Sequence, residues 1–122
     1  MQSNFDLPKS TAIEYLFSYG TLQKEQVQMD LFGRKLTGEI DRLEGYKIKP
    51  VIISDLAFLE RGEDQNQKIA IHTNNPADKI EGTAFEVSED ELMQSDQYEP
   101  VDYKRVMVKL KSGRSAWIYA AI

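Results

Sequence analysis

The sequence predicts an α+β fold: a small β-barrel of about six or seven mixed strands with two or more short flanking helices. Most of the chain alternates between apolar and polar residues, which is the pattern of strands with one buried face. Turn-forming clusters of Gly, Pro, Asn and Asp separate these runs, and only two stretches have helical spacing. A chain of 122 residues can also bury one hydrophobic core without disulfides or metals.

Composition excludes several classes of chemistry. The chain has no cysteine, hence no disulfide, thiolate zinc site or cysteine nucleophile, and its single histidine cannot form a His-pair metal site. The net charge of −5 argues against a nucleic-acid partner, because such proteins bind phosphates through excess Lys and Arg. No apolar run approaches the roughly 20 residues of a membrane helix, and the N-terminus lacks the pattern of a secretion signal. We therefore expect a cytoplasmic protein with no membrane association.

The expected domain covers residues 13–122. Residues 1–12 are polar and include Pro8, so we expect a flexible lead-in there. From Ile13 to Phe17 apolar residues occupy every second position, which predicts the first strand with these residues on its inner face. No repeat, low-complexity tract or linker divides the rest of the chain.

A glycine-containing turn joins this strand to a helix. The turn is Tyr19-Gly20-Thr21-Leu22, and the helix is predicted over residues 23–32. Val27 and Leu31, four residues apart, give the helix its apolar stripe. Gly33 follows at the position where helices commonly end in a left-handed residue.

Further strands are predicted from the same alternation. Gly38 indicates a bulge or a close backbone approach, and Pro50, which lacks an amide hydrogen, places its strand at a sheet edge or bulge. Residues 60–68 are polar and charged and are expected to form a solvated loop. Gly113 marks the turn of a final hairpin. These strands are predicted over residues 35–43, 46–53, 68–73, 80–87, 105–110 and 115–120.

The second helix has clear start and stop signals. Ser88 and Glu91 form a capping box, which places the helix start at residue 89. The helix can extend only to about Gln97, because Pro100 restricts Glu99 to an extended conformation.

The turn around Gly20 is the first candidate for chemistry. A strand that passes through glycine into a helix directs several backbone N–H groups into one concavity, which favours a carboxylate, a phosphate or a developing oxyanion. Taken alone, this pattern more often has only a structural role.

Glu99 is the second candidate. It follows the second helix directly, where the chain turns back towards the closing strands. A carboxylate at the mouth of an apolar barrel is desolvated, which raises its pKa from ~4.3 towards the range of a general base. Taken alone, a solvated acid at a helix end is the more common situation.

Other conspicuous residues favour structural interpretations. His72 is out of phase with Ile69 and Ile71 and is expected at the surface or an edge. The loop acids lack the regular spacing of a calcium site and are expected to be surface charges: Glu60, Glu63 and Asp64. Aromatic residues at strand spacing are expected in the barrel core: Tyr15, Phe17, Trp117 and Tyr119.

Five short motifs occur in an order that is shared with a known family. They are Tyr19-Gly20-Thr21-Leu22, Leu36-Thr37-Gly38 with Gly45-Tyr46, Ile80-Glu81-Gly82 with Phe85-Glu86-Val87, Asp96-Gln97-Tyr98-Glu99 with Tyr103-Lys104-Arg105, and Trp117-Ile118-Tyr119. Together they resemble the gamma-glutamylcyclotransferase-like superfamily over about residues 15–120. The family has glycine after its catalytic glutamate, whereas this chain has Pro100.

The resemblance implies an activity and a site. Members release 5-oxoproline from a gamma-glutamyl amino acid or amine, by internal attack of the substrate α-amine on the side-chain carbonyl. Glu99 is then the catalytic general base. The substrate-binding residues are Tyr19, Gly20, Thr21 and Leu22, through their backbone amides, with Tyr103 and Tyr119 lining the cavity. Because the substrate supplies its own nucleophile, no cofactor or metal is expected.

Two alternatives remain open at this point. The chain could be a catalytically inactive binding module that holds a small carboxylate-bearing metabolite on the same fold. It could also be an interaction protein that pairs a sheet edge with a partner protein. The oligomeric state and the leaving group of a substrate are not specified by the sequence.

Overall fold

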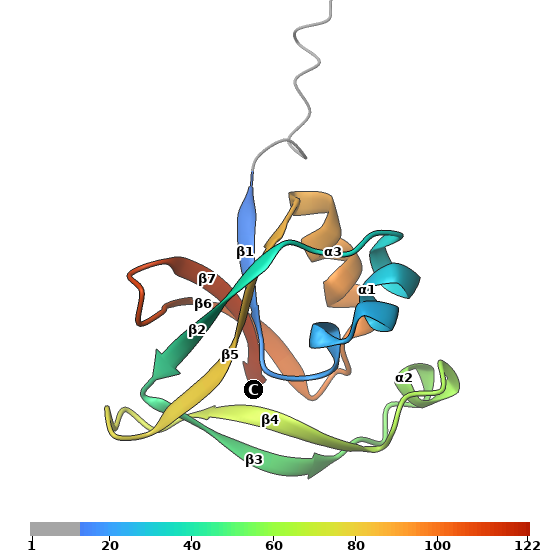
Figure 1. Ribbon diagram of the computed structural model, residues 1–122. Coiled ribbons are helices and arrows are strands. Elements are labelled where there is room, and N and C mark those ends of the chain that lie inside the picture. Colours follow the sequence, from blue (N-terminus) through green and yellow to red (C-terminus); the bar gives the residue numbers. More distant parts are fainter. Residues whose placement is uncertain (1–12) are drawn as a thin grey trace, which may run out of the picture.

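A computed structural model describes residues 13–122 (Figure 1). The lead-in expected over residues 1–12 lies outside the described residues. The elements are β1 (Glu14–Ser18), a 3-10 helix η3 (Thr21–Gln23), α1 (Glu25–Phe32), β2 (Gly38–Glu44), β3 (Tyr46–Ile52), α2 (Leu56–Glu60), β4 (Asn66–His72), β5 (Lys79–Val87), α3 (Glu89–Tyr98), β6 (Tyr103–Lys109) and β7 (Ser115–Ala121). Within the described residues, no helix combines the length and the apolar character that a membrane span requires.

The seven strands form one mixed sheet. Its order is β2-β5-β1-β7-β4-β3, and β6 pairs with β7 beside this path. β7 runs parallel to β1 and to β4, and the remaining pairs are antiparallel. The sheet curls strongly, with α1 and α3 together on one side and α2 beyond the ends of β3 and β4 (Figure 1). This is the α+β fold that the sequence predicts, in the form of a half-barrel: β2 and β3 end the sheet and do not pair to close it.

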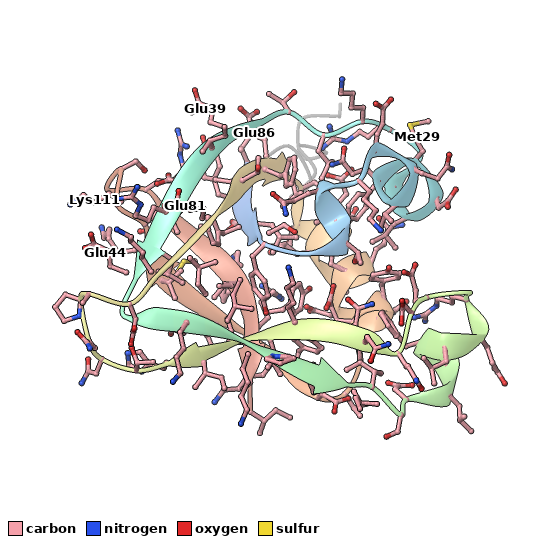
Figure 2. The ribbon with its side chains drawn as sticks, turned by 60° about the horizontal axis from the view of Figure 1, so that its bottom comes forward. Met29, Glu39, Glu44, Glu81, Glu86 and Lys111 are labelled. Atoms are coloured by element: carbon pink, nitrogen blue, oxygen red, sulfur yellow. The ribbon has the colours of Figure 1, made fainter. Side chains whose placement is uncertain are left out.

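The two ends of the sheet are protected in different ways. Pro50 lies in β3, which pairs only with β4, so its expected edge position is confirmed. Charged side chains crowd β2 and its neighbour β5 (Figure 2). Several of them form ion pairs, namely Arg42–Glu81 at 2.6 Å, Arg114–Glu39 at 3.1 Å and Lys111–Glu44 at 3.5 Å. Proline and charges on edge strands oppose pairing with another chain.

The predicted helix signals are confirmed where capping residues define them. Ser88 Oγ accepts from the Glu91 N–H at 3.1 Å, and the Glu91 carboxylate accepts from the Ser88 N–H at 2.9 Å. Gly33 ends α1 with a φ of 71°. Glu99 is extended, with a ψ of 144°, as Pro100 requires.

One prediction about local structure is wrong, and one helix was not predicted. The first strand does not have a single inner face: Leu16, Phe17 and Ser18 are all buried, while Ile13 is exposed. β1 lies in the middle of the sheet, and both of its faces are covered. The segment before β4 holds the helix α2, which sequence periodicity did not reveal because five residues are too few to show it.

Buried side chains form two main clusters on the two faces of the sheet. The first comes from strands and strand ends and consists of Phe17, Leu43, Ala70, Ile80, Ala84, Leu110, Ala116, Ile118 and Ala120. The second also includes residues of α3 and of the η3 turn, and consists of Leu16, Leu22, Leu36, Phe85, Val87, Leu92 and Tyr119. Strand β1 contributes to both, so its C-terminal end is fixed from both sides.

Gly82 of β5 permits the close approach of β5 to β1. A Cβ atom at this position would lie 2.5 Å from the Ser18 carbonyl oxygen and 2.8 Å from the Phe17 ring. Because the nearest atom belongs to the backbone, the Gly82→Ala variant must shift a central strand. We expect a loss of about 1–3 kcal/mol in the free energy of unfolding, measured by urea denaturation.

Gly20→Ala is the matched control for this prediction. Its added Cβ has no atom within 4 Å, and the φ of Gly20, −131°, lies outside the left-handed region. If Gly82→Ala unfolds at the same urea concentration as Gly20→Ala, the proposed clash is not what makes glycine necessary at this position.

Candidate active site

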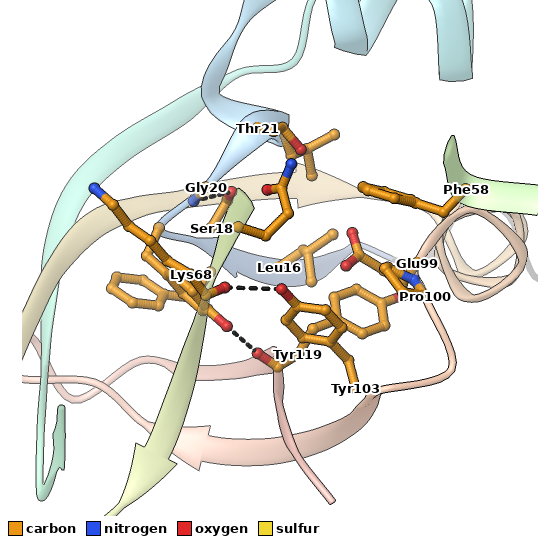
Figure 3. Close-up of a pocket in the computed structure, with 14 residues that line it drawn as sticks. Leu16, Ser18, Gly20, Thr21, Phe58, Lys68, Glu99, Pro100, Tyr103 and Tyr119 are labelled. Carbon is orange, nitrogen blue, oxygen red and sulfur yellow. Dashed lines mark hydrogen bonds between the residues drawn. The ribbon is translucent and has the colours of Figure 1, made fainter. Parts of the chain in front are cut away.

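A hollow opens at the C-terminal end of β1, where several elements converge (Figure 3). Its empty volume is about 480 Å³, open mouth included. The lining residues come from β1 and the turn that follows it, α2, β4, the turn after α3, β6 and β7. They are Leu16, Phe17, Ser18, Tyr19, Gly20, Thr21, Leu22, Phe58, Gln67, Lys68, Glu99, Pro100, Tyr103 and Tyr119.

The hollow forms where two strands share one edge of β7. β6 pairs with one edge of β7 along the whole length of β7, so β1 and β4 both pair with the other edge of β7. The Tyr19 hydroxyl bridges the break between them: it donates to the Tyr119 carbonyl at 2.6 Å and accepts from the Ala70 N–H at 2.9 Å. Burial raises the pKa of Tyr19 well above its usual value, although the Ala70 bond opposes this, so the hydroxyl keeps its proton.

The Tyr19→Phe variant tests this bridge. It removes the donor to the Tyr119 carbonyl and leaves the Ala70 N–H without its partner. We expect the free energy of unfolding to fall by about 1–3 kcal/mol, measured by urea denaturation. Tyr46→Phe is the control, since the Tyr46 ring stacks on exposed His72 at the edge of the sheet. Equal stability of the two variants would contradict the structural role of the Tyr19 hydroxyl.

The sequence-predicted residues lie together in this hollow. Glu99 and the Tyr19–Leu22 segment line it from opposite elements, and Tyr103 and Tyr119 complete the wall. In Figure 3 the Glu99 carboxylate points into the space beneath Thr21 and beside Leu16. The structure therefore brings the two candidate sites into one place, while the catalytic and binding roles of these residues stay predictions.

The environment of Glu99 strongly changes its acidity. Burial is the main cause, and the negative charges of Glu63 and Asp96 add to it; together they raise the pKa of Glu99 to about 8. A carboxyl group with this pKa exchanges its proton near neutral pH, which is the property of a general acid or base.

The turn after β1 has backbone N–H groups beside the hollow. The Gly20 N–H donates weakly to Ser18 Oγ at 3.3 Å, and the Gly20 carbonyl accepts from the Gln23 N–H at 3.1 Å. Within residues 13–122, no hydrogen bond is found from the N–H groups of Thr21 and Leu22. Free N–H groups at the first positions of a helical turn favour an anionic ligand.

Asp96 stays ionised close to Glu99. Burial opposes ionisation, but the hydrogen bonds from Arg105 and from the Tyr119 hydroxyl prevail and hold the pKa of Asp96 below its usual value. The Arg105 guanidinium contacts both Asp96 carboxylate oxygens, at 2.7 and 2.9 Å, and the Tyr119 hydroxyl donates to Asp96 Oδ1 at 2.6 Å. Two acids three residues apart thus have pKa values pushed in opposite directions, as in many acid–base sites.

The two lining tyrosines are held by their hydroxyl groups. Tyr119 donates to Asp96, and Tyr103 donates to the Lys68 carbonyl at 2.8 Å. Each hydroxyl group thus donates its proton to another part of the protein, and the tyrosine rings form part of the wall of the hollow. A second, shallower hollow shares Glu99, Pro100 and both tyrosines with the first and continues to Arg105 and Trp117.

Seven of the lining residues were not among the predicted site residues, namely Leu16, Phe17, Ser18, Pro100, Phe58, Gln67 and Lys68. The last three lie in or beside the segment expected to be a solvated loop, and no motif marks them. Within residues 13–122, no cluster of three His, Cys, Asp or Glu side chains is placed to bind an ion.

The curled sheet thus carries a hollow that is lined both by the turn after β1 and by Glu99. The sequence profile of the family described as gamma-glutamyl cyclotransferase, AIG2-like, matches residues 16–121. The chain belongs to this family, and the resemblance inferred from its short motifs is confirmed. No curated protein sequence matches the chain significantly.

Solved structures share the fold at low sequence identity. A protein from Arabidopsis thaliana, determined in solution, has a TM-score of 0.64 at 20% identity, over 90% of this chain and 62% of its own. A gamma-glutamyl cyclotransferase has a TM-score of 0.70 at 15% identity, over 91% and 68% of the two chains. An uncharacterized protein from Homo sapiens has a TM-score of 0.67 at 18% identity, over 90% and 67%. The chain thus spans less than two thirds of the length of the Arabidopsis protein.

Proposed function

We propose that this protein releases 5-oxoproline from a gamma-glutamyl amino acid or amine, with Glu99 as general base. The observation that carries the proposal is the position of one buried carboxylate opposite the free amides of Thr21 and Leu22 in a single hollow. Membership of the gamma-glutamyl cyclotransferase, AIG2-like family supports it. The reaction takes place in the cytoplasm on a small molecule, without nucleic acid or membrane.

In the proposed reaction the substrate binds by its α-carboxylate. This group accepts hydrogen bonds from the Thr21 and Leu22 amides, which directs the α-ammonium group towards Glu99. A positive charge beside a carboxyl group lowers its pKa, so Glu99 ionises as the substrate binds. The carboxylate then removes one proton from the α-ammonium group and leaves a neutral amine.

The neutral amine attacks the γ-carbonyl carbon of the same molecule. A C–N bond forms and closes the five-membered ring, and the tetrahedral intermediate collapses when the bond to the leaving amine breaks. Glu99 returns its proton to the leaving nitrogen, and the ring nitrogen then gives up its second proton through the freed carboxylate to the released amine, which departs as an ammonium group. The reaction thus consumes no water and regenerates the carboxylate. The neighbouring hollow beside Arg105 and Trp117 provides space for the leaving amine.

In this scheme, most of the rate acceleration comes from holding the substrate in the geometry for internal attack. Well-oriented intramolecular reactions reach effective molarities of about 10⁵–10⁸ M, so holding a folded substrate conformer is a large contribution. A positioned general base typically adds about 10²–10⁴-fold. Since the nucleophile belongs to the substrate, the scheme requires no metal, cofactor or protein nucleophile.

Incubation of the purified protein with gamma-glutamyl amino acids and amines tests the proposal. We expect 5-oxoproline and the free amine in equal amounts, detected by mass spectrometry. Thermal stabilisation by 5-oxoproline without turnover of any substrate would instead identify a binding module. Pro100, which replaces the glycine of the family pattern, makes this second function worth measuring in the same experiment.

A further inference from the structure

Arg61 joins the end of α2 to the end of α3. Its guanidinium donates to the Tyr98 carbonyl at 2.8 Å and to the Gln97 carbonyl at 3.1 Å. The last carbonyls of a helix have no partner within the helix, so Arg61 satisfies two of them and places a positive charge at the negative end of the helix dipole. These carbonyls belong to the two residues that directly precede Glu99.

Asp55 holds the chain on the other side of Glu99. One of its carboxylate oxygens caps α2 by accepting from the Ala57 N–H at 3.1 Å and the Phe58 N–H at 3.4 Å. The other oxygen accepts from the Val101 N–H at 3.1 Å. Because Pro100 has no N–H, the Val101 amide is the first backbone donor after Glu99.

Phe58 fills the space between these two contacts. It is 2% exposed, packs edge-on against Tyr98 with ring centres 5.7 Å apart, and lines the hollow together with Glu99. Figure 3 shows its ring close to Glu99 and Pro100. The segment from Asp55 to Arg61 thus contacts the chain on both sides of Glu99, and its Phe58 lines the same hollow as Glu99.

We propose that Asp55 and Arg61 are positioning residues that clamp residues 97–101 and thereby hold the Glu99 carboxylate in the hollow. This inference rests on the proposed function in assigning the reaction to Glu99. Neither residue touches the substrate in this scheme, and both act through the backbone on either side of the base. Their loss frees the turn and admits water to the carboxylate, so the geometry and the acidity of Glu99 both change.

Two substitutions separate the clamp from the local stability of α2. Asp55→Asn keeps one carbonyl oxygen that can cap α2, but presents an amide nitrogen to the Val101 N–H or rotates away from it. Arg61→Ala removes both donors, whereas Arg61→Lys can still reach one carbonyl and is expected to restore part of the effect.

Arg34→Ala is a matched control. Arg34 donates to the Glu86 carbonyl at 3.2 Å and binds the Glu91 carboxylate at 2.8 Å, at the opposite end of α3. Like Arg61, it donates from its guanidinium group to a backbone carbonyl, but it does not contact residues 97–101.

The Glu99 titration, followed by carbon-13 NMR of the side-chain carboxyl in the full chain, is the decisive measurement. We expect the pKa of Glu99 to fall by about one unit or more in Asp55→Asn and Arg61→Ala, because a hydrated carboxyl returns towards its ordinary value. With a substrate that the parent protein converts, kcat of the two variants is expected to fall roughly 10- to 100-fold, with a smaller change in KM. Arg34→Ala leaves both quantities as in the parent protein.

The titration is independent of the proposed reaction. If the parent protein releases no 5-oxoproline, the proposed function fails, while the NMR comparison still tests the clamp. An unchanged Glu99 titration in folded Asp55→Asn and Arg61→Ala overturns the clamp. An equal change in Arg34→Ala also overturns it, because the effect would then reflect general loosening of the fold. If Arg61→Ala does not fold, Asp55→Asn and Arg61→Lys decide the question.

Discussion

Glu99→Gln is expected to abolish the release of 5-oxoproline and to leave the fold intact. The amide has nearly the same shape as the carboxyl group but cannot accept the proton of the substrate α-ammonium group. We expect kcat to fall by about 10²–10⁴-fold, which is the range that a positioned general base contributes. Because the proposed α-carboxylate contacts lie on the Thr21–Leu22 segment, KM is expected to change much less.

Glu89→Gln is the control for this variant. Glu89 is an exposed acid at the opposite end of α3, so its substitution makes the same chemical change without reaching the hollow. Both variants and the parent protein are compared by initial rates of 5-oxoproline formation and by thermal unfolding. If Glu99→Gln turns over substrate as fast as Glu89→Gln, Glu99 is not the base.

The second large effect is a dependence of stability on pH that originates at Glu99. In the folded protein the pKa is about 8, against an ordinary value of 4.5, so between these pH values the folded state binds the proton and the unfolded state releases it. The stabilisation from this group is complete below pH 4.5 and is lost as the pH rises to about 8. Since one pKa unit corresponds to about 1.4 kcal/mol, the upper bound of the loss is about 5 kcal/mol.

Urea denaturation of the parent protein and of Glu99→Gln at several pH values measures this effect. The variant carries a neutral group at every pH, so its stability relative to the parent protein is expected to increase steadily between pH 5 and pH 8. Above about pH 8 the difference is expected to level off. A constant difference across this range would mean that the Glu99 carboxyl group is as hydrated in the folded protein as in the unfolded chain.

The parts of the fold that the sequence predicted correctly are mainly those with local causes. Ser88 and Glu91 lie one helical turn apart and cap each other, so their pattern is visible in four residues. Gly33 takes the left-handed conformation that closes a helix. The close approach expected at Gly38 is also found, because an added Cβ would lie 2.6 Å from the Phe85 ring. In the first two cases a few neighbouring residues determine the structure, whereas Gly38 marks a contact with a strand distant in the sequence.

The parts that could not be predicted depend on contacts between distant segments. Leu16 and Phe17 are both buried because β1 has strands on either side and is covered on both faces, and alternation along a single strand does not show this. Ile69 and Ala70 point to opposite faces of β4, and both are buried. β1 and β4 pair with the same edge of β7, and the hollow opens between them. This arrangement follows only from the sheet topology.

The candidate site divides in the same way. Glu99 and the Tyr19–Leu22 segment could be singled out because they belong to short motifs. Asp55 and Arg61 could not, because their role comes from hydrogen bonds to the backbone more than thirty residues away, at Val101 and Tyr98. Backbone acceptors and donors are identical in every residue apart from the missing donor of proline, so the sequence carries no signal of such contacts.

A crystal structure of Glu99→Gln with an intact gamma-glutamyl compound tests the central claim most directly. The account predicts that the substrate α-carboxylate accepts from the backbone amides of Thr21 and Leu22, and that the α-amine lies within hydrogen-bonding distance of residue 99. A substrate bound with its α-amine directed away from that residue, or bound outside the hollow, would contradict the account.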